Sequence, residues 1–272
     1  MSEIQMTAVM EGKVVFKLRR GKKDTLCLLP TTLRGFPVHF VIDTGAYHSF
    51  VGVDVLTRLG LQHVMDPNHP VMDTVGRREE DMHEGGATLR LEVGLVFTAE
   101  HDFCVSGAGR NILGSDFLRN YDGVLWFSEQ DDLLLLSKQR RQLEVGEQFR
   151  LYAPCQVFGH TVMAQLDSGA NTTTLPRNVV PVTAIMEGVL RTEKVKVIGG
   201  VQKQTVCHLQ PQEAEVAGHH VTLRYPTVFF RNAGNLTVLD VNFLRQNCVR
   251  INCRKRKIKF KKENFFKVKR LK

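Results

Sequence analysis

Apolar residues in this chain occur in short runs broken by glycine and polar turns, the pattern typical of β-strands. Two runs share an arrangement in which a glycine stands eight residues before an aspartate, at 35–43 and at 159–167. Each predicts a hairpin turn that leads into a buried strand. Only short segments such as 53–61 and 116–120 have helical character. The pattern therefore predicts an all-β protein.

The same landmarks recur in the same order in the two halves of the chain, which indicates an internal repeat. The sequence ILGSDFLR at 112–119 follows the first aspartate at nearly the same spacing as VLDVNFLR at 238–245 follows the second. A predicted hairpin with a polar tip comes after each of them. We therefore expect two similar lobes rather than one continuous sheet.

The repeat divides the chain into an N-terminal extension with a first strand (1–24), lobe one (25–137), a linker (138–147), lobe two (148–262) and a basic tail (263–272). Each lobe has an ordinary domain size.

Composition fits a folded chain, with 272 residues of which 43% are hydrophobic and 24% are charged. No apolar run approaches the roughly 18 residues of a membrane helix, and the N-terminus lacks the apolar core of a signal peptide. Six cysteines are too sparse for a disulfide scaffold, so we expect reduced thiols. These features predict a cytoplasmic location, with the nucleus as the alternative.

The net charge of +9 is concentrated at the C-terminal end. Eleven Lys and Arg residues stand in 254–272 against Glu263 alone, so the rest of the chain is nearly neutral. Alternation in 257–260 predicts a final strand with lysines on its solvent face. The alternative is weak contact of segment 254–272 with nucleic acid or an anionic surface.

Candidate chemistry lies in the turns that end the two repeated strands, Asp43-Thr44-Gly45-Ala46 and the matching Asp-Ser-Gly-Ala at 167–170. Two carboxylates about 3 Å apart cannot both ionise, so the pair keeps one proton. One member can then act as a general base toward water while the other acts as a general acid.

The segments Ile42–Ala46 (IDTGA) and Ile112–Leu118 (ILGSDFL) closely resemble the retropepsin-like aspartic proteases, which include retroviral and retrotransposon proteases. In lobe two the DSGA turn and the glycines at 199–200 match, whereas the later motif departs from the pattern. The resemblance implies two tandem acid-protease lobes, closed and barrel-like, that form a pseudo-dimer. It also implies an aspartic endopeptidase with a peptide substrate and no cofactor or metal.

The resemblance assigns roles to individual residues. Asp43 and Asp167 become the catalytic pair, and the loops that support them contain Thr44, Gly45, Ala46, Ser168, Gly169 and Ala170. The flaps that would cover bound substrate contain Thr74, Val75, Gly76, Ile198, Gly199, Gly200 and Val201.

Ala46 and Ala170 stand where pepsin-like relatives usually place a hydroxyl residue. Without that hydrogen-bond donor the pKa values of the pair should rise, which predicts a pH optimum nearer neutral than that of digestive relatives.

Other interpretations remain open at this point. Asp-Thr-Gly is also ordinary turn chemistry, so Asp43 could be a turn residue. Asp240 replaces the glycine of the family motif, where it could distort lobe two or bring a third carboxylate to the pair. Lobe two would then be catalytically silent, leaving a peptide-binding module or a homodimer that pairs Asp43 from two chains.

A monomer is favoured because both aspartates are in one chain. The histidines lack the spacing of metal ligands.

Overall fold

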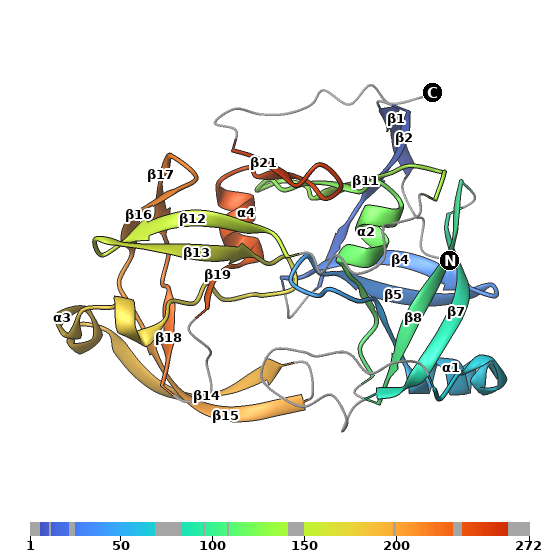
Figure 1. The fold of residues 1–272 in the computed structure, drawn as a ribbon, viewed down its shortest axis with the longest axis horizontal. Helices are drawn as coiled ribbons and strands as arrows, with labels where there is room; N and C mark the ends of the chain where they lie inside the picture. Colours follow the sequence, from blue (N-terminus) through green and yellow to red (C-terminus); the bar gives the residue numbers. More distant parts are fainter. Residues whose placement is uncertain are drawn as a thin grey trace.

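The computed structural model describes residues 6–10, 12–21, 25–68, 83–94, 96–107, 109–140, 150–197, 200–230 and 236–260. The described chain is mostly β-structure with a few short helices, arranged as two lobes (Figure 1). The prediction of two tandem all-β lobes is confirmed.

Lobe one is built on a seven-stranded sheet that curls on itself. In spatial order its strands are β3 (Arg19–Arg20), β4 (Cys27–Leu33), β5 (Phe36–Ile42), β9 (Ile112–Leu113), β6 (Phe50–Gly52), β8 (Phe97–Ser106) and β7 (His83–Val93). An additional pairing of β4 with β7 closes this sheet into a barrel. The helices of lobe one are α1 (Val53–Arg58), η1 (Gln62–Val64) and α2 (Ser115–Asn120).

Lobe two has a related but more open arrangement. One sheet runs β17 (His219–Leu223), β16 (Gln212–Val216), β12 (Tyr152–Val157), β13 (His160–Leu166) and β19 (Thr237–Leu239). A second sheet runs β14 (Val189–Val197), β15 (Gly200–His208) and β18 (Thr227–Phe229). Its helices are η3 (Arg177–Val179), α3 (Val182–Met186) and α4 (Val241–Gln246).

A third sheet joins the two lobes and lies along the top of Figure 1. Its order is β1 (Met6–Met10), β2 (Lys13–Lys17), β11 (Leu133–Leu136), β10 (Val124–Trp126), β20 (Arg250–Asn252) and β21 (Lys257–Lys259). The β10–β11 hairpin of lobe one thus pairs with an N-terminal strand on one side and with lobe two on the other. Backbone hydrogen bonds therefore fix the position of one lobe against the other.

The glycines of the repeat lie in tight hairpin turns. Arg34 and Gly35 connect β4 to β5 with φ of 49° and 80°, and Phe158 and Gly159 connect β12 to β13 with φ of 51° and 77°. Two consecutive positive φ angles are the geometry of a two-residue turn that suits twisted strands. Each turn starts the strand that ends at one of the candidate aspartates.

The helices agree only partly with the elements expected from sequence. Helix α1 begins at Val53 as expected and ends at Arg58, and α2 occupies the second expected segment. Helix α3 has no counterpart among the elements expected from sequence, and much of its apolar surface is exposed, with Met186 79% accessible. Within the described ranges, no helix has the length and apolar character needed to span a membrane.

A buried ion pair connects the lobes near the third sheet. Asp132 of lobe one is fully buried, and its Oδ2 atom lies 2.7 Å from Nη2 and 2.8 Å from Nε of Arg245 on α4. Arg20 adds a contact of 3.2 Å to the same oxygen, and the Cys27 thiol lies 3.5 Å from it. Burial, together with the charge of Asp132, raises the pKa of Cys27, so this thiol stays protonated.

We expect Asp132→Ala to destabilise the protein by about 3 kcal/mol or more, because Arg245 would keep a buried charge without its partner. Urea denaturation should show a lower midpoint for this variant. Asp131→Ala is the matched control, since Asp131 forms only an exposed pair with Lys17. Equal losses in the two variants would contradict the importance of the Asp132–Arg245 pair.

Candidate active site

The two candidate aspartates occupy equivalent ends of parallel strand pairs. Strand β5 runs parallel to β9, and the N–H of Asp43 donates to the carbonyl of Leu113 at 3.1 Å. Strand β13 runs parallel to β19, and the N–H of Asp167 donates to the carbonyl of Leu239 at 3.0 Å. The sheet of each lobe therefore holds the start of its candidate loop.

The loops are joined by reciprocal hydrogen bonds between Thr44 and Ser168, both almost fully buried. Thr44 Oγ1 donates to the carbonyl of Leu166 at 2.8 Å and accepts from the N–H of Ser168 at 3.0 Å. Ser168 Oγ donates to the carbonyl of Ile42 at 2.8 Å and accepts from the N–H of Thr44 at 3.0 Å. Each hydroxyl thus bonds to the backbone of the opposite loop, which fixes the two aspartates relative to each other.

Each aspartate is held by the backbone of its own loop. The N–H groups of Gly45 and Ala46 donate to Asp43 Oδ1 at 2.8 and 3.0 Å. Those of Gly169 and Ala170 donate to Asp167 Oδ1 at 2.8 and 3.1 Å. Oδ1 of each carboxylate is therefore oriented by its own loop.

Each carboxylate also lies against the glycine of the opposite loop. A Cβ atom on Gly45 would stand 2.3 Å from Asp167 Oδ2, and one on Gly169 would stand 2.2 Å from Asp43 Oδ2. Real Cβ atoms are never this close to other heavy atoms, so only glycine fits at either position. The close approach of the two acids therefore depends on both glycines.

Burial and mutual proximity perturb the pKa values of the pair. Burial raises the pKa of Asp43, which is 9% exposed, although hydrogen bonds from Asp167, Ala46 and Gly45 and the charge of Arg110 offset part of the rise. Burial and then the neighbouring Asp43 raise the pKa of Asp167 well above its usual range. The two carboxylates therefore resist double ionisation and keep one proton between them.

The raised pKa of Asp167 predicts how stability depends on pH. A carboxyl whose pKa is higher in the folded than in the unfolded state favours folding below pH about 4, and this contribution is lost as pH rises through the folded-state pKa. Asp167→Asn removes the titration, so the variant should gain free energy of unfolding relative to the unmodified protein on going from pH 4 to pH 7. Urea denaturation at both values measures this.

The matched control for that comparison is Asp54→Asn, which alters an exposed carboxylate on α1. The raised pKa of Asp167 would be contradicted if Asp167→Asn gained no free energy of unfolding relative to the unmodified protein between pH 4 and pH 7.

In lobe one, the Ser49 hydroxyl and the Asp116 carboxylate connect the candidate loop to the strand and the helix that follow it in the fold. Ser49 Oγ accepts from the N–H of Gly114 at 3.0 Å and donates to Asp116 Oδ1 at 2.7 Å. A Cβ at Gly114 would stand 2.4 Å from the carbonyl oxygen of His48, so the strand and the loop touch through their backbones. Ser49 thereby ties the candidate loop to the start of α2.

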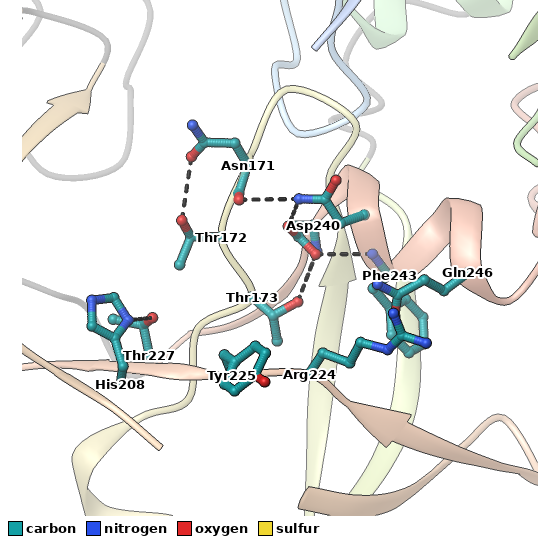
Figure 2. Close-up of a pocket in the computed structure, with 11 residues that line it drawn as sticks. Asn171, Thr172, Thr173, His208, Arg224, Tyr225, Thr227, Asp240, Phe243 and Gln246 are labelled. Atoms are coloured by element: carbon teal, nitrogen blue, oxygen red, sulfur yellow. Dashed lines mark hydrogen bonds between the residues drawn. The ribbon is translucent and has the colours of Figure 1, made fainter. Parts of the chain in front are cut away.

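Lobe two builds the same support with its carboxylate two positions earlier in the chain (Figure 2). Thr173 Oγ1 accepts from the N–H of Asp240 at 3.3 Å and donates to Asp240 Oδ1 at 2.8 Å. The same Oδ1 accepts from the N–H of Phe243 at 3.0 Å and caps α4, while Asn242 donates to Oδ2 at 2.9 Å. Asp240 thus accepts a hydrogen bond from the loop hydroxyl of lobe two, as Asp116 does in lobe one.

This geometry corrects the sequence-based expectation that Asp240 could distort the lobe or form a third member of the pair. The Asp240 carboxylate is buried and bonded to its own helix and to Thr173. Because β13 and β19 keep their parallel pairing, lobe two accommodates the change without loss of the strand crossing.

We expect Asp240→Ala to lower the free energy of unfolding by about 1–2 kcal/mol, because it removes the helix cap and leaves the Thr173 hydroxyl without its acceptor. Asp240→Asn keeps an acceptor oxygen for Thr173 and Phe243 and loses only the hydrogen bond from Asn242, so it should cost less than the alanine variant. Thermal denaturation of the two variants tests this. An alanine variant as stable as the unmodified protein would show that the cap is unimportant.

One segment of the chain matches a known protein family. Residues 29–120, which lie in lobe one, match the family described as "gag-polyprotein putative aspartyl protease". Lobe one is therefore similar to this family, and the match does not extend to lobe two. No curated protein matches the chain.

Two further side chains at this candidate site had no signal in the sequence. Gln165 Nε2 donates to the carbonyl of Gly45 at 3.2 Å, which adds another bond between the loops. Arg110, two residues before β9, is close enough for its charge to lower the pKa of Asp43. Both depend on how the lobes are placed together, which a local motif does not reveal.

The residues expected to form flaps are only partly covered by the structure. Thr74, Val75, Gly76, Ile198 and Gly199 lie outside the described residues. Gly200 and Val201 belong to β15, which pairs along its length with β14 in a long hairpin. Their role toward substrate stays a prediction. Within the described ranges, no group of three or more His, Cys, Asp or Glu residues is placed to hold a metal ion.

Proposed function

We propose that this chain is an aspartic endopeptidase in which Asp43 and Asp167 activate water in a cleft between the two lobes. The observation that carries the proposal is the mutual approach of the two carboxylates, each against the other loop's glycine, within one polypeptide. The family match of lobe one supports protease chemistry.

In this mechanism the pair starts with one shared proton, which is written here on Asp167. Ionised Asp43 removes a proton from water as the water oxygen forms a bond to the peptide carbonyl carbon, and Asp167 donates its proton to the carbonyl oxygen. The resulting gem-diol gives one proton back to Asp167, and Asp43 delivers its proton to the nitrogen as the C–N bond breaks. The products are a carboxylic acid and an amine, and the pair returns to its singly protonated state.

The substrate that we propose is an extended peptide, because such a chain can pair its backbone like an added strand while alternate side chains enter pockets. The flap role of the stretches at 74–76 and 198–201, and a preference for hydrophobic residues around the scissile bond, are part of this proposal.

We further propose that the active unit is a monomer. The contacts of Thr44 with Ser168 and of Gly45 with Gln165 connect the lobes within one chain and favour this over a homodimer that pairs two copies of Asp43. Asp240 was the feature that favoured a silent peptide-binding module, and its place as a helix cap removes that argument.

A cytoplasmic location, with the nucleus as the alternative, belongs to the same proposal. All six cysteines are free, as expected for a reducing compartment. Contact of segment 254–272 with nucleic acid or an anionic surface is also proposed; its residues after 260 lie outside the described part of the chain.

The deciding experiment is cleavage of a mixed peptide library between pH 4 and pH 8 by the purified chain. We expect Asp43→Asn and Asp167→Asn each to reduce kcat by at least about a hundredfold, because each removes one partner in proton transfer. A statine-type transition-state mimic should inhibit the unmodified chain. Because the pKa of Asp167 is raised, activity should persist well above pH 4.

Asp54→Asn is the control for these variants, and analytical ultracentrifugation gives the mass of the active species. Loss of activity only in Asp43→Asn, together with a dimeric mass, would favour the homodimer. The absence of cleavage under all conditions would refute the endopeptidase.

A further inference from the structure

The two lobes differ in what fills the space beside the supporting carboxylate. In lobe one, His101 is buried, with Nε2 3.3 Å from Asp116 Oδ2, and His48 Nδ1 lies 3.9 Å from the same atom. His101 also packs edge-on against the rings of Phe103 and Phe117. Two imidazole rings therefore occupy the space around Asp116.

Equivalent positions in lobe two follow from matching backbone hydrogen bonds. The N–H of Cys104 donates to the carbonyl of Ser49 at 3.0 Å, and the N–H of Thr227 donates to the carbonyl of Thr173 at 2.9 Å. Ser49 and Thr173 each stand six residues after the aspartate of their lobe. These two bonds give Ser49 and Cys104 of lobe one the same places as Thr173 and Thr227 of lobe two.

One of these histidines has a clear counterpart in lobe two. His48 directly precedes Ser49, and the residue directly before Thr173 is Thr172. A small hydroxyl side chain thus takes the place of one imidazole ring. Arg224 directly follows β17 and precedes Tyr225, where the chain has a φ of 50°.

Beside Thr172 lies a cavity of about 390 Å³ (Figure 2). Most of the side chains that line it are polar. They are Asn171, Thr172, Thr173, His208, Arg224, Tyr225, Thr227, Asp240, Asn242, Phe243 and Gln246.

Besides Tyr225, the cavity wall contains three ionisable side chains. Two of them, Asp240 and His208, already have partners. Both oxygens of Asp240 accept hydrogen bonds, as described above. The ring of His208 lies between Thr227 and Glu193, with 2.9 Å from Nδ1 to the hydroxyl and 2.9 Å from Nε2 to the carboxylate. These groups are therefore committed to the protein itself.

Arg224 is exposed and, among the described residues, its guanidinium has no hydrogen-bond or ion-pair partner. In the same part of the chain, the side chains of Tyr225 and Gln246 also make no hydrogen bond. The wall thus presents one unneutralised positive charge together with neutral groups that can donate hydrogen bonds. Such a set suits a carboxylate, which a guanidinium can bind through two parallel hydrogen bonds.

The cavity adjoins the candidate active site on one side. Asn171 follows Ala170 and is four residues from Asp167, so their Cα atoms are at most about 15 Å apart. An extended peptide covers that distance in about four residues. On its other side the cavity contacts His208, at the end of the β14–β15 hairpin. A peptide centred on the pair is therefore long enough to reach the cavity.

We propose that this cavity is a specificity subsite for an aspartate or glutamate side chain of the substrate, three or four residues from the scissile bond, with Arg224 as its partner. The subsite rests on the proposed endopeptidase function. The cavity lies in lobe two, where Thr172 takes the place of His48.

The test uses pairs of peptides that are cleaved by the chain and differ only by Glu or Gln at each position within four residues of the cleaved bond. At one position we expect kcat/KM to be about threefold to tenfold higher for Glu, the range for a partly exposed charged hydrogen bond. This preference should disappear in Arg224→Met, persist in part in Arg224→Lys and weaken with added salt. Arg90→Met, which alters an exposed arginine on β7, should retain it.

A second measurement keeps the subsite separable from catalysis. Fluorescence anisotropy uses the Asp43→Asn variant, with and without Arg224→Met, and extended peptides that differ only by Glu or Gln, whether or not the chain cleaves them. It gives the ratio of Kd values for Gln and Glu peptides. Equal binding and cleavage of Glu and Gln peptides, or a preference that survives Arg224→Met, would overturn the subsite. A ratio that depends on Arg224 in a chain that cuts nothing would support the subsite while refuting the endopeptidase.

Discussion

The close approach of two backbone loops is the constraint on which the site depends. Two carboxylates can share a proton only if nothing separates them, and here each lies where a Cβ on the opposite glycine would collide with it. Such proximity is unfavourable because burial and like charge both oppose ionisation. The reciprocal bonds of Thr44 and Ser168 supply the opposing force, since each hydroxyl satisfies a donor and an acceptor of the other loop.

The rest of the architecture keeps these loops in place. Parallel pairing of β5 with β9 and of β13 with β19 anchors each aspartate at its N–H group. The third sheet combines strands from both ends of the chain with the β10–β11 hairpin, so the lobes share backbone hydrogen bonds as well as side-chain contacts. Buried Asp132 and Arg245 add a charged contact between the lobes that is costly to break on one side only.

The two lobes build the same contact from different residues. A hydroxyl six residues after each aspartate meets a carboxylate near the following helix, but the carboxylate comes from Asp116 in one lobe and from Asp240 in the other. Asn242, which stands where lobe one has Asp116, donates to Asp240 instead. Beside this contact, Thr172 stands in the place of His48 and lines a cavity.

The sequence by itself determined the repeated pattern and the β-rich lobes. It also determined the turns at Gly35 and Gly159 and the two Asp-[Thr/Ser]-Gly-Ala loops. These features depend on local spacing and on the φ angles that glycine permits. Only the tertiary structure decided that Asp43 meets Asp167 within one chain and that Asp240 caps α4. It also decided that Gln165 bonds to Gly45 and that a cavity opens beside Arg224. These contacts join residues far apart in sequence, and the direction of a side chain such as Asp240 depends on which hydroxyl and N–H groups the fold brings beside it.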